Sequence, residues 1–299
     1  MNTNSNVYTI VYTTIVVVVA AAILSIAAMA LKPKQDANIK AETISQMLTA
    51  AGFSSKEELA KESNEQILAM YSQNIKAAFL IDARGDKIDE LETEVSSIEL
   101  QDNLKVEHKN IAAGDPSLPV YVFEKDGAEI NVIPCYGAGL WGPIWGYIAF
   151  NAECTEIVGA YFDHDSETPG LGAKIKDEAW FREQFKGKKV DFAHPDNPFD
   201  IVKGGAPEGA ASQVDAITGA TMTCNGLDQA LDIWFKAYMP FLQKKAGAAD
   251  SEDCCGCCDG DDCCDGDDCC DADGDCCQEG EGHQHEHHNH NHNHQESQS

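Results

Sequence analysis

Basic side chains are scarce in this chain. It has 21 Lys and Arg against 50 Asp and Glu, which gives a formal net charge of −29. Sixteen of the acidic residues and no basic residue lie in residues 250–299, and residues 37–249 carry about −14. A nucleic-acid-binding protein needs a basic face that displaces counterions from phosphates. The composition therefore excludes nucleic acid as a partner and predicts an acidic, solvated body.

Sequence signatures of common enzyme classes are also missing. The chain has no Gly-x-Ser-x-Gly elbow, no P-loop and no dinucleotide fingerprint. His108, His164 and His194 are isolated in the sequence, and we expect each to be a surface or hydrogen-bonded histidine. We therefore predict no catalytic residue and no nicotinamide site in this chain.

The first 31 residues contain no charged side chain. The apolar run from Val7 to Leu31 would span about 37 Å as a helix, and a bilayer core is about 30 Å thick. A signal peptide is the alternative, with 27–30 as the cleavage site, but its apolar run is shorter and follows a basic segment. We predict an uncleaved anchor over 1–36. Lys32 and Lys34 follow it, which by the positive-inside rule places the body in the cytoplasm.

The periodicity of apolar residues predicts the order of helices and strands. Helical spacing extends over 36–83, with a break at 51–52 and a second start near 54–57. Alternating runs predict a hairpin of 119–123 with 130–134 and a strand pair of 147–151 with 157–163. Helices are expected over 177–186, burying Trp180, Phe181 and Phe185, and over 223–245. Such segregated runs are typical of an α+β fold with a largely antiparallel sheet, here as one domain over 37–248.

Residues 215–223, Asp-Ala-Ile-Thr-Gly-Ala-Thr-Met-Thr, join a turn at Gly219 to the start of the last helix. The N-terminus of a helix offers unpaired amides and a positive dipole, which suit a phosphate. Thr218, Thr221 and Thr223 add hydroxyl groups. An ordinary capped helix start explains the same residues, and spacing alone does not decide between the two.

This segment resembles the flavinylation motif Asp-x-x-Ser/Thr-Gly-Ala-Thr of proteins that carry FMN covalently on its last threonine. Two further blocks match the same proteins, Glu-Thr-Pro-Gly-Leu-Gly at 167–172 and Gly-Leu-Trp-Gly-Pro-Ile-Trp-Gly-Tyr at 139–147. With the anchor, the pattern over about 1–245 is similar to one covalent-FMN family, the singly anchored flavin subunits of sodium-translocating NADH:quinone reductases. The equivalent flavin subunit of the related ferredoxin-linked electron-transport complex is the closest alternative.

The resemblance implies an FMN-binding domain that one helix anchors to the bacterial inner membrane. It also implies that this domain faces the periplasm, which is the opposite of what Lys32 and Lys34 indicate. It implies electron transfer toward ubiquinone within a sodium-pumping complex whose other subunits include the NADH site, and a separate flavin transferase. Thr221 would hold FMN by a phosphoester. The residues expected beside the flavin are Thr218, Gly219, Ala220, Thr223, Glu167, Thr168, Gly170, Leu171 and Gly172. Trp141 and Trp145 are expected to fill the core or meet a partner subunit.

Cysteines are few before residue 250 and dense after it. Cys135 and Cys154 are expected to be buried, and Cys224 lies at a helix start, which lowers a thiol pKa. Residues 249–299 have almost no apolar side chain besides cysteine, so we predict a disordered tail. Its thiols and imidazoles suit zinc or copper, whereas export would favour disulfides. The predicted ligands are Cys254, Cys255, Cys257, Cys258, His283, His285 and His287. A membrane-anchored metal-binding protein acting through this tail is the alternative from a different class.

Overall fold

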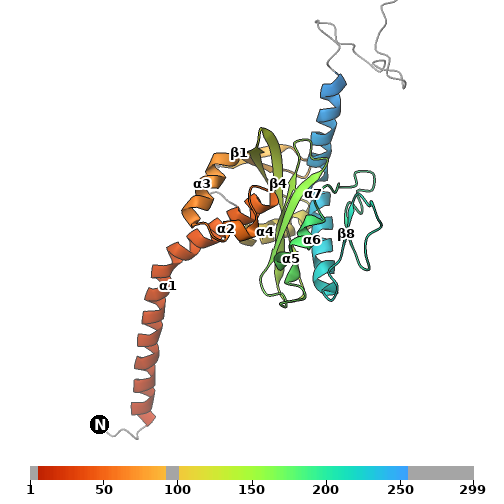
Figure 1. Ribbon diagram of the computed structural model, residues 1–299. Helices are drawn as coiled ribbons and strands as arrows, with labels where there is room; N and C mark the ends of the chain where they lie inside the picture. The colour runs from red at the N-terminus through yellow and green to blue at the C-terminus, as the bar shows by residue number, and fades with distance from the viewer. Residues whose placement is uncertain (1–5, 92–100, 255–299) are drawn as a thin grey trace, which may run out of the picture. The chain divides into compact units, whose positions relative to one another are not determined.

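The N-terminal part of the chain is a single long helix. The computed structural model describes residues 6–91 and 101–254, and helix α1 spans Asn6–Ala50 (Figure 1). Its first half exposes apolar side chains, with a window of mean hydropathy 2.7, and is long and apolar enough to cross a membrane. Its buried residues begin at Ala41. The predicted domain boundary at residue 36 lies inside this helix and stays a prediction.

Six antiparallel strands form the central sheet, in the spatial order β2-β1-β3-β4-β5-β6. The strands are β1 (Ile75–Ile81), β2 (Lys87–Leu91), β3 (Leu118–Lys125), β4 (Ala128–Ala138), β5 (Pro143–Phe150) and β6 (Ile157–His164). The β3–β4 turn places Asp126 and Gly127 at φ 53° and 82°, as a two-residue hairpin loop requires. Both predicted strand pairs are confirmed.

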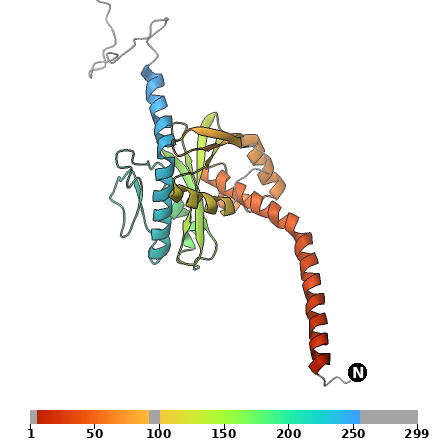
Figure 2. The same cartoon turned by 180° about the vertical axis from the view of Figure 1, so that it is seen from behind.

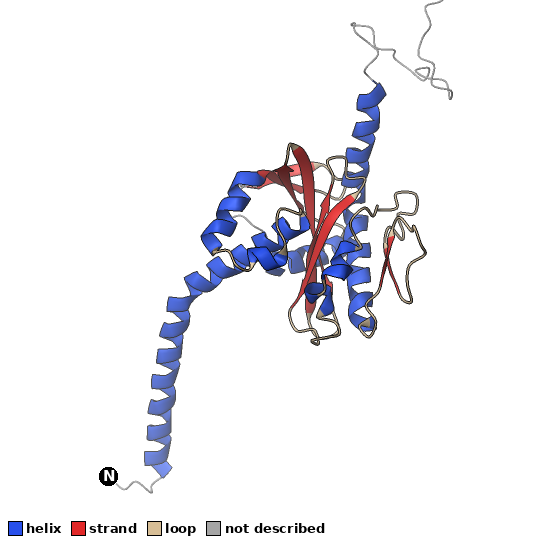
Figure 3. Ribbon diagram, viewed as in Figure 1, coloured by secondary structure: helices blue, strands red, loops and turns tan. Residues whose placement is uncertain are grey.

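Helices cover both faces of the sheet. Alternate residues of each strand point to opposite sides, and the apolar residues on each side pack against a helical layer. Tyr121 and Phe123 of β3 pack with the buried end of α1 and with α3 (Asn64–Asn74). Val120 and Val122 face α7 (Thr221–Cys254). Figure 1 shows α1 and the sheet, and Figure 2 shows the molecule from behind, with α7 on that side. Figure 3 shows the sheet strands between the helices. The predicted α+β class is confirmed.

Short elements complete the fold around this sheet. They are α2 (Lys56–Leu59), α4 (Gln101–Ala113), α5 (Lys174–Asp177) and α6 (Ala179–Glu183), with the parallel pair β7 (Asp200–Val202) and β8 (Gln213–Asp215). Strand β8 ends where the 215–223 segment begins and delivers it to the start of α7. The predicted buried face of α7 is confirmed, with Leu227, Leu231 and Trp234 in the core.

Two predictions of helices are wrong. Residues 75–81 form the strand β1 and not a helix, because their backbone pairs with β3 on one side and with β2 on the other. The second predicted helix consists of two separate helices, α2 and α3, because Ser55 and Ser63 each cap a helix start with a capping box.

Trp180 is 44% exposed, while Phe181 and Phe185 are buried as predicted. Extended backbone at Glu178 separates α5 from α6, so the tryptophan does not share the helical face that 177–186 would present.

Candidate functional site

The turn before α7 is fixed by contacts on both sides. The amide of Ala220 donates to the carbonyl of Ile217 at 3.1 Å, and Gly219 has φ 85°, which a residue with a side chain rarely adopts. The carboxylate of Asp215 accepts the amide of Ala206 at 2.7 Å. Gln184 accepts the Asp215 amide at 2.8 Å and donates to its carbonyl at 3.4 Å. Sequence reasoning missed Gln184, which lies 31 residues away.

A small pocket of about 140 Å³ opens between this turn, the loop at 165–172 and the β4–β5 turn. It is lined by Leu140, Glu167, Thr168, Leu171, Gly172, Gly219, Ala220, Thr221, Met222 and Thr223. The structure thus brings together most of the residues predicted to lie beside a flavin, although they come from distant parts of the sequence. Thr218 and Gly170 are exposed and lie outside the lining. Leu140 and Met222 were not predicted.

The two threonines of α7 differ in what their hydroxyls do. Thr223 is 2% exposed, and its hydroxyl donates to Oε2 of Glu167 at 2.6 Å. It is the third residue of α7, so it does not cap the helix, and its predicted contact with a phosphate stays a prediction. Thr221 is partly exposed and lines the pocket, and within the described residues its hydroxyl has no hydrogen-bond partner. Only the Thr221 hydroxyl of this pair is uncommitted.

Glu167 joins the three segments of the pocket. Its side chain is 4% exposed and accepts from the Trp141 amide at 2.9 Å as well as from Thr223. A Cβ at Gly139 or at Gly172 would clash with its carboxylate. Glycine at these two positions therefore leaves the space in which the carboxylate lies, and the predicted Glu-Thr-Pro-Gly-Leu-Gly block has a packing role.

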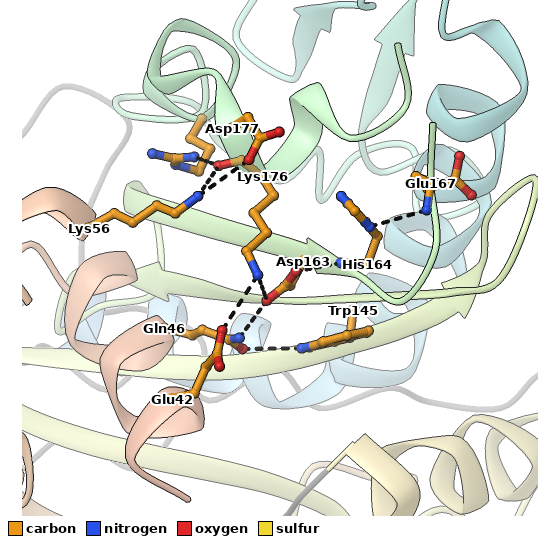
Figure 4. A network of polar contacts seen from close by, with 10 residues as sticks. Glu42, Gln46, Lys56, Trp145, Asp163, His164, Glu167, Lys176 and Asp177 are labelled. Atoms are coloured by element: carbon orange, nitrogen blue, oxygen red, sulfur yellow. Dashed lines mark hydrogen bonds and ion pairs between the residues drawn. The ribbon is translucent and has the colours of Figure 1, made fainter. Parts of the chain in front are cut away.

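A polar network extends from Glu167 toward α1 (Figure 4). The Glu167 amide donates to Nδ1 of His164 at 3.2 Å, and the His164 amide donates to Asp163 at 2.7 Å. Asp163 is buried and accepts from Gln46 of α1 and from Lys176, each at 2.8 Å. Burial raises the pKa of Asp163, and the hydrogen bond and charge of Lys176 oppose that rise. Nothing in the sequence pattern indicated this network.

Exposed apolar side chains surround the mouth of the pocket. Leu140 and Leu171 are about half exposed, Met222 is 59% exposed and Trp141 is 66% exposed. Trp145 is half-buried, and its indole Nε1 donates to Oε1 of Gln46 at 3.1 Å. It therefore packs inside the domain, as expected, whereas Trp141 is free to meet another molecule.

The cysteines differ from expectation at one position. Cys135 and Cys154 are buried free thiols, as predicted. Cys224 is also buried, and burial raises the pKa of its thiol; the Ile217 amide, which donates to the sulfur at 3.3 Å, only partly offsets this. The expected lowering at a helix start is wrong here because the thiol faces the core and not the pocket.

His108 accepts from the Trp234 indole at 3.2 Å, and His194 contacts Asp191 at 2.9 Å, so both are hydrogen-bonded as expected. The predicted metal ligands of the tail lie outside the residues whose side chains the structure describes. Among 6–91 and 101–254, no group of three His, Cys, Asp or Glu is placed to hold a metal ion.

Comparisons with known proteins agree on one family. The FMN-binding domain model matches residues 139–236, which contain the whole pocket lining. NqrC of the Na(+)-translocating NADH-quinone reductase of Vibrio vulnificus is 30% identical over 243 residues, or 76% of this chain and 90% of the relative. The crystal structure of the same component of that reductase from Parabacteroides distasonis has a TM-score of 0.58 and 31% identity, covering 71% of this chain and 96% of that one. The structure of NqrC from Shewanella oneidensis has a TM-score of 0.55 and 25% identity, covering 71% and 99%.

Proposed function

The chain belongs to the NqrC family of Na(+)-translocating NADH-quinone reductases, and from that premise we propose that it carries FMN covalently on Thr221. The family membership decides against the flavin subunit of the ferredoxin-linked complex. It also makes the chain one part of an oxidoreductase complex, so other subunits are its partners. In this proposal electrons pass through the bound flavin toward ubiquinone while the complex translocates sodium, and NADH is oxidised on another subunit.

One observation carries the choice of residue. Of the hydroxyls that line the pocket on α7, Thr223 is buried and donates to Glu167, whereas Thr221 has no partner within the described residues. A hydroxyl that becomes a phosphoester loses its proton and can no longer donate. Esterifying Thr221 costs no hydrogen bond within the described residues, whereas esterifying Thr223 would remove the donor of the buried Oε2 of Glu167.

The surroundings of Thr221 fit a phosphate. The first amide of α7 to bond back along the chain is that of Cys224, to Ala220 at 2.9 Å. The amides of Thr221, Met222 and Thr223 precede it and have no acceptor within the helix, so they can stabilise an anion. These donors supply the attraction that a phosphate end needs.

The size of the pocket limits what it can enclose. Its volume of about 140 Å³ is below the roughly 300–1,000 Å³ of pockets that enclose a whole small molecule. It would hold the phosphate end, and the apolar side chains at its mouth, Leu171 and Met222 among them, would border the ring. FMN supplies the electron transfer, and the protein supplies position and environment. A ring left partly uncovered is accessible to an electron-transfer partner.

Attachment requires an enzyme and an activated donor, because an alcohol and a phosphate monoester do not condense in water. The proposed donor class is a flavin dinucleotide with a phosphoanhydride bond. The Thr221 oxygen would bond to the flavin-side phosphorus, the anhydride P–O bond would break, and a nucleoside monophosphate would leave. The hydroxyl proton would pass to a base of the flavin transferase, since no described side chain is hydrogen-bonded to the Thr221 hydroxyl.

The membrane topology is a separate part of the proposal. The apolar half of α1 would span the inner membrane with the flavin domain in the periplasm, as the family resemblance implies. A membrane-impermeant lysine reagent added to cells with a permeabilised outer membrane should then label the body. Protection until the inner membrane is broken would mean that Lys32 and Lys34 mark the cytoplasmic side.

Covalent flavin is tested by coexpressing the full chain with a flavin transferase and illuminating a denaturing gel with ultraviolet light. The wild-type band should fluoresce. The Thr221→Val variant should not, because it removes the hydroxyl at nearly equal volume, and Thr221→Ser should retain part of the signal. Fluorescence that persists in Thr221→Val would mean another attachment site, and a dark wild-type band would contradict covalent attachment.

A further inference from the structure

We propose that His164 is a positioning residue that holds the loop at 165–172 in place against the attachment turn. The idea rests on the proposed function, because that loop and turn form the proposed flavin pocket. His164 itself is not near enough to Thr221 to line the pocket, so it would act through Glu167. Its own position would be fixed from the other side by Asp163 and helix α1.

His164 supplies a central anchor of this loop, beside the Ser166 hydroxyl, which donates to the Trp141 carbonyl at 3.3 Å. The loop begins where the Asp165 amide donates to the Pro143 carbonyl at 3.0 Å. Its residues are exposed except Glu167 and Gly172. Within 6–91 and 101–254, the backbone of Glu167 is held by one hydrogen bond, from its amide to Nδ1 of His164 at 3.2 Å. This bond holds the Glu167 backbone in position, and the Glu167 carboxylate in turn accepts from the Trp141 amide and the Thr223 hydroxyl.

The chemistry of the ring explains why a histidine suits this position. Nδ1 accepts the hydrogen bond that the Glu167 amide donates, so Nδ1 carries no proton itself and the neutral ring is protonated on Nε2. Nε2 is buried and has no partner among the described residues. A buried polar atom without a partner is unfavourable, and an apolar side chain would avoid it. The contribution of the imidazole at this position is therefore its acceptor at Nδ1, which binds the Glu167 amide.

The position of His164 depends on helix α1. Its amide donates to one oxygen of Asp163, and the other oxygen accepts from Gln46 and Lys176 (Figure 4). Gln46 is buried, and its amide oxygen accepts from Trp145. Lys176 also reaches Glu42 of α1 at 3.5 Å. The extramembrane half of α1 is thus tied to strand β6 one residue before the histidine.

Two substitutions separate the acceptor from the rest of the ring. His164→Asn keeps a side-chain oxygen that can accept the Glu167 amide, and His164→Leu fills similar space without an acceptor. Losing one such bond should raise the population of the open loop about fivefold. We expect hydrogen exchange of peptides covering 165–172 to accelerate about fivefold in the leucine variant and to stay near wild type in the asparagine variant. Exchange in β3 and β4 should not change in either.

The full-length chain with its flavin allows a second readout that a purely structural role would not change. Flavin content, fluorescence spectrum and midpoint potential are measured on the same samples. His164→Leu should keep the covalent flavin but shift its spectrum and potential, and His164→Asn should restore both. If the leucine variant does not fold, His164→Ala, which adds no new contact, replaces it.

Several outcomes would overturn the proposal. They are unchanged exchange at 165–172 in the leucine or alanine variant, faster exchange across the whole core, or a flavin spectrum and potential that do not respond. An asparagine variant that behaves like the leucine one would show that the acceptor is not what matters. A wild-type chain without flavin would defeat the proposed function alone, because the exchange experiment needs no flavin to test His164.

Discussion

Two hollows in the domain show that volume is a poor guide to a binding site. The larger, of about 470 Å³, lies between α1, α2 and the sheet and is lined by Glu42, Gln46, Lys56 and Lys176 among others. Its two lysines are already paired, Lys176 with Asp163 at 2.8 Å and Lys56 with Asp177 at 3.6 Å. The smaller, at the start of α7, has about 140 Å³ but holds the first amides of a helix and the Thr221 hydroxyl, which has no partner among the described side chains. Uncommitted donors distinguish the candidate site from a structural hollow.

The difference between the two hollows is tested most directly at Glu167, the buried carboxylate in the lining of the smaller pocket. Glu167→Leu removes both of its bonds and leaves the Thr223 hydroxyl and the Trp141 amide without an acceptor. We expect the free energy of unfolding to fall by about 2–5 kcal/mol, measured by denaturant unfolding. Glu167→Gln should lose less, because its amide oxygen still accepts one bond. Glu57→Gln, at an exposed position, is the control and should change stability by less than about 0.5 kcal/mol. A loss as small as the control would mean that the pocket does not depend on this carboxylate.

The larger hollow is tested at its central ion pair. Lys176→Met leaves Asp163 buried without its cation, which should lower the free energy of unfolding by about 1–3 kcal/mol at neutral pH. Burial raises the pKa of Asp163, so between its unfolded and folded pKa values the folded state binds more protons. Stability in that window falls as pH rises. The deficit of the variant should therefore shrink toward about pH 4, where the unfolded carboxyl is also protonated.

Lys236 provides the matched control for that variant. It forms an exposed pair with Asp232 on α7 at 2.9 Å, and Lys236→Met should cost less than about 1 kcal/mol with no comparable recovery in acid. A deficit in Lys176→Met that does not depend on pH would show that lost packing, and not the unpaired carboxylate, is responsible.

The smallest effects distinguish the two threonines within the smaller pocket. Thr223→Val removes the donor to Glu167 and should lower the free energy of unfolding by about 1–2 kcal/mol while leaving the covalent flavin in place. Thr221→Val should change the stability of the flavin-free chain by less than about 0.5 kcal/mol, because its hydroxyl has no partner to lose in the part of the chain that the structure describes. Thermal unfolding of both flavin-free variants checks this, and equal losses would remove the distinction on which the choice of Thr221 depends.

The sequence predicted the local features of this protein better than the distant ones. The hairpin at Asp126-Gly127 and the apolar face of α7 could be predicted because each depends on neighbouring residues, whereas the pocket-lining blocks were predicted from their resemblance to a known family. Strand β1 was missed because its helical appearance is overridden by pairing with β2 and β3.

Contacts between distant segments left no trace in the local pattern. Gln46 and Asp163 are 117 residues apart, and Glu167 and Thr223 are 56 residues apart. Periodicity cannot report such contacts, because each partner looks like an ordinary polar residue in its own segment. The prediction of a lowered pKa for the Cys224 thiol was wrong for a related reason, because the burial of this thiol depends on which face of α7 meets the sheet. Which threonine is free became visible only once Glu167 was placed.

The most direct test of the account is to locate the flavin in the loaded wild-type chain by mass spectrometry. Trypsin should release residues 204–236 as one peptide, because Lys203 and Lys236 bound a stretch without Lys or Arg. This peptide contains Thr218, Thr221 and Thr223, and its fragments distinguish them. The account predicts the mass of FMN less one water on Thr221 alone. The same mass on Thr218 or Thr223, or an unmodified peptide from a chain made with an active transferase, would contradict it.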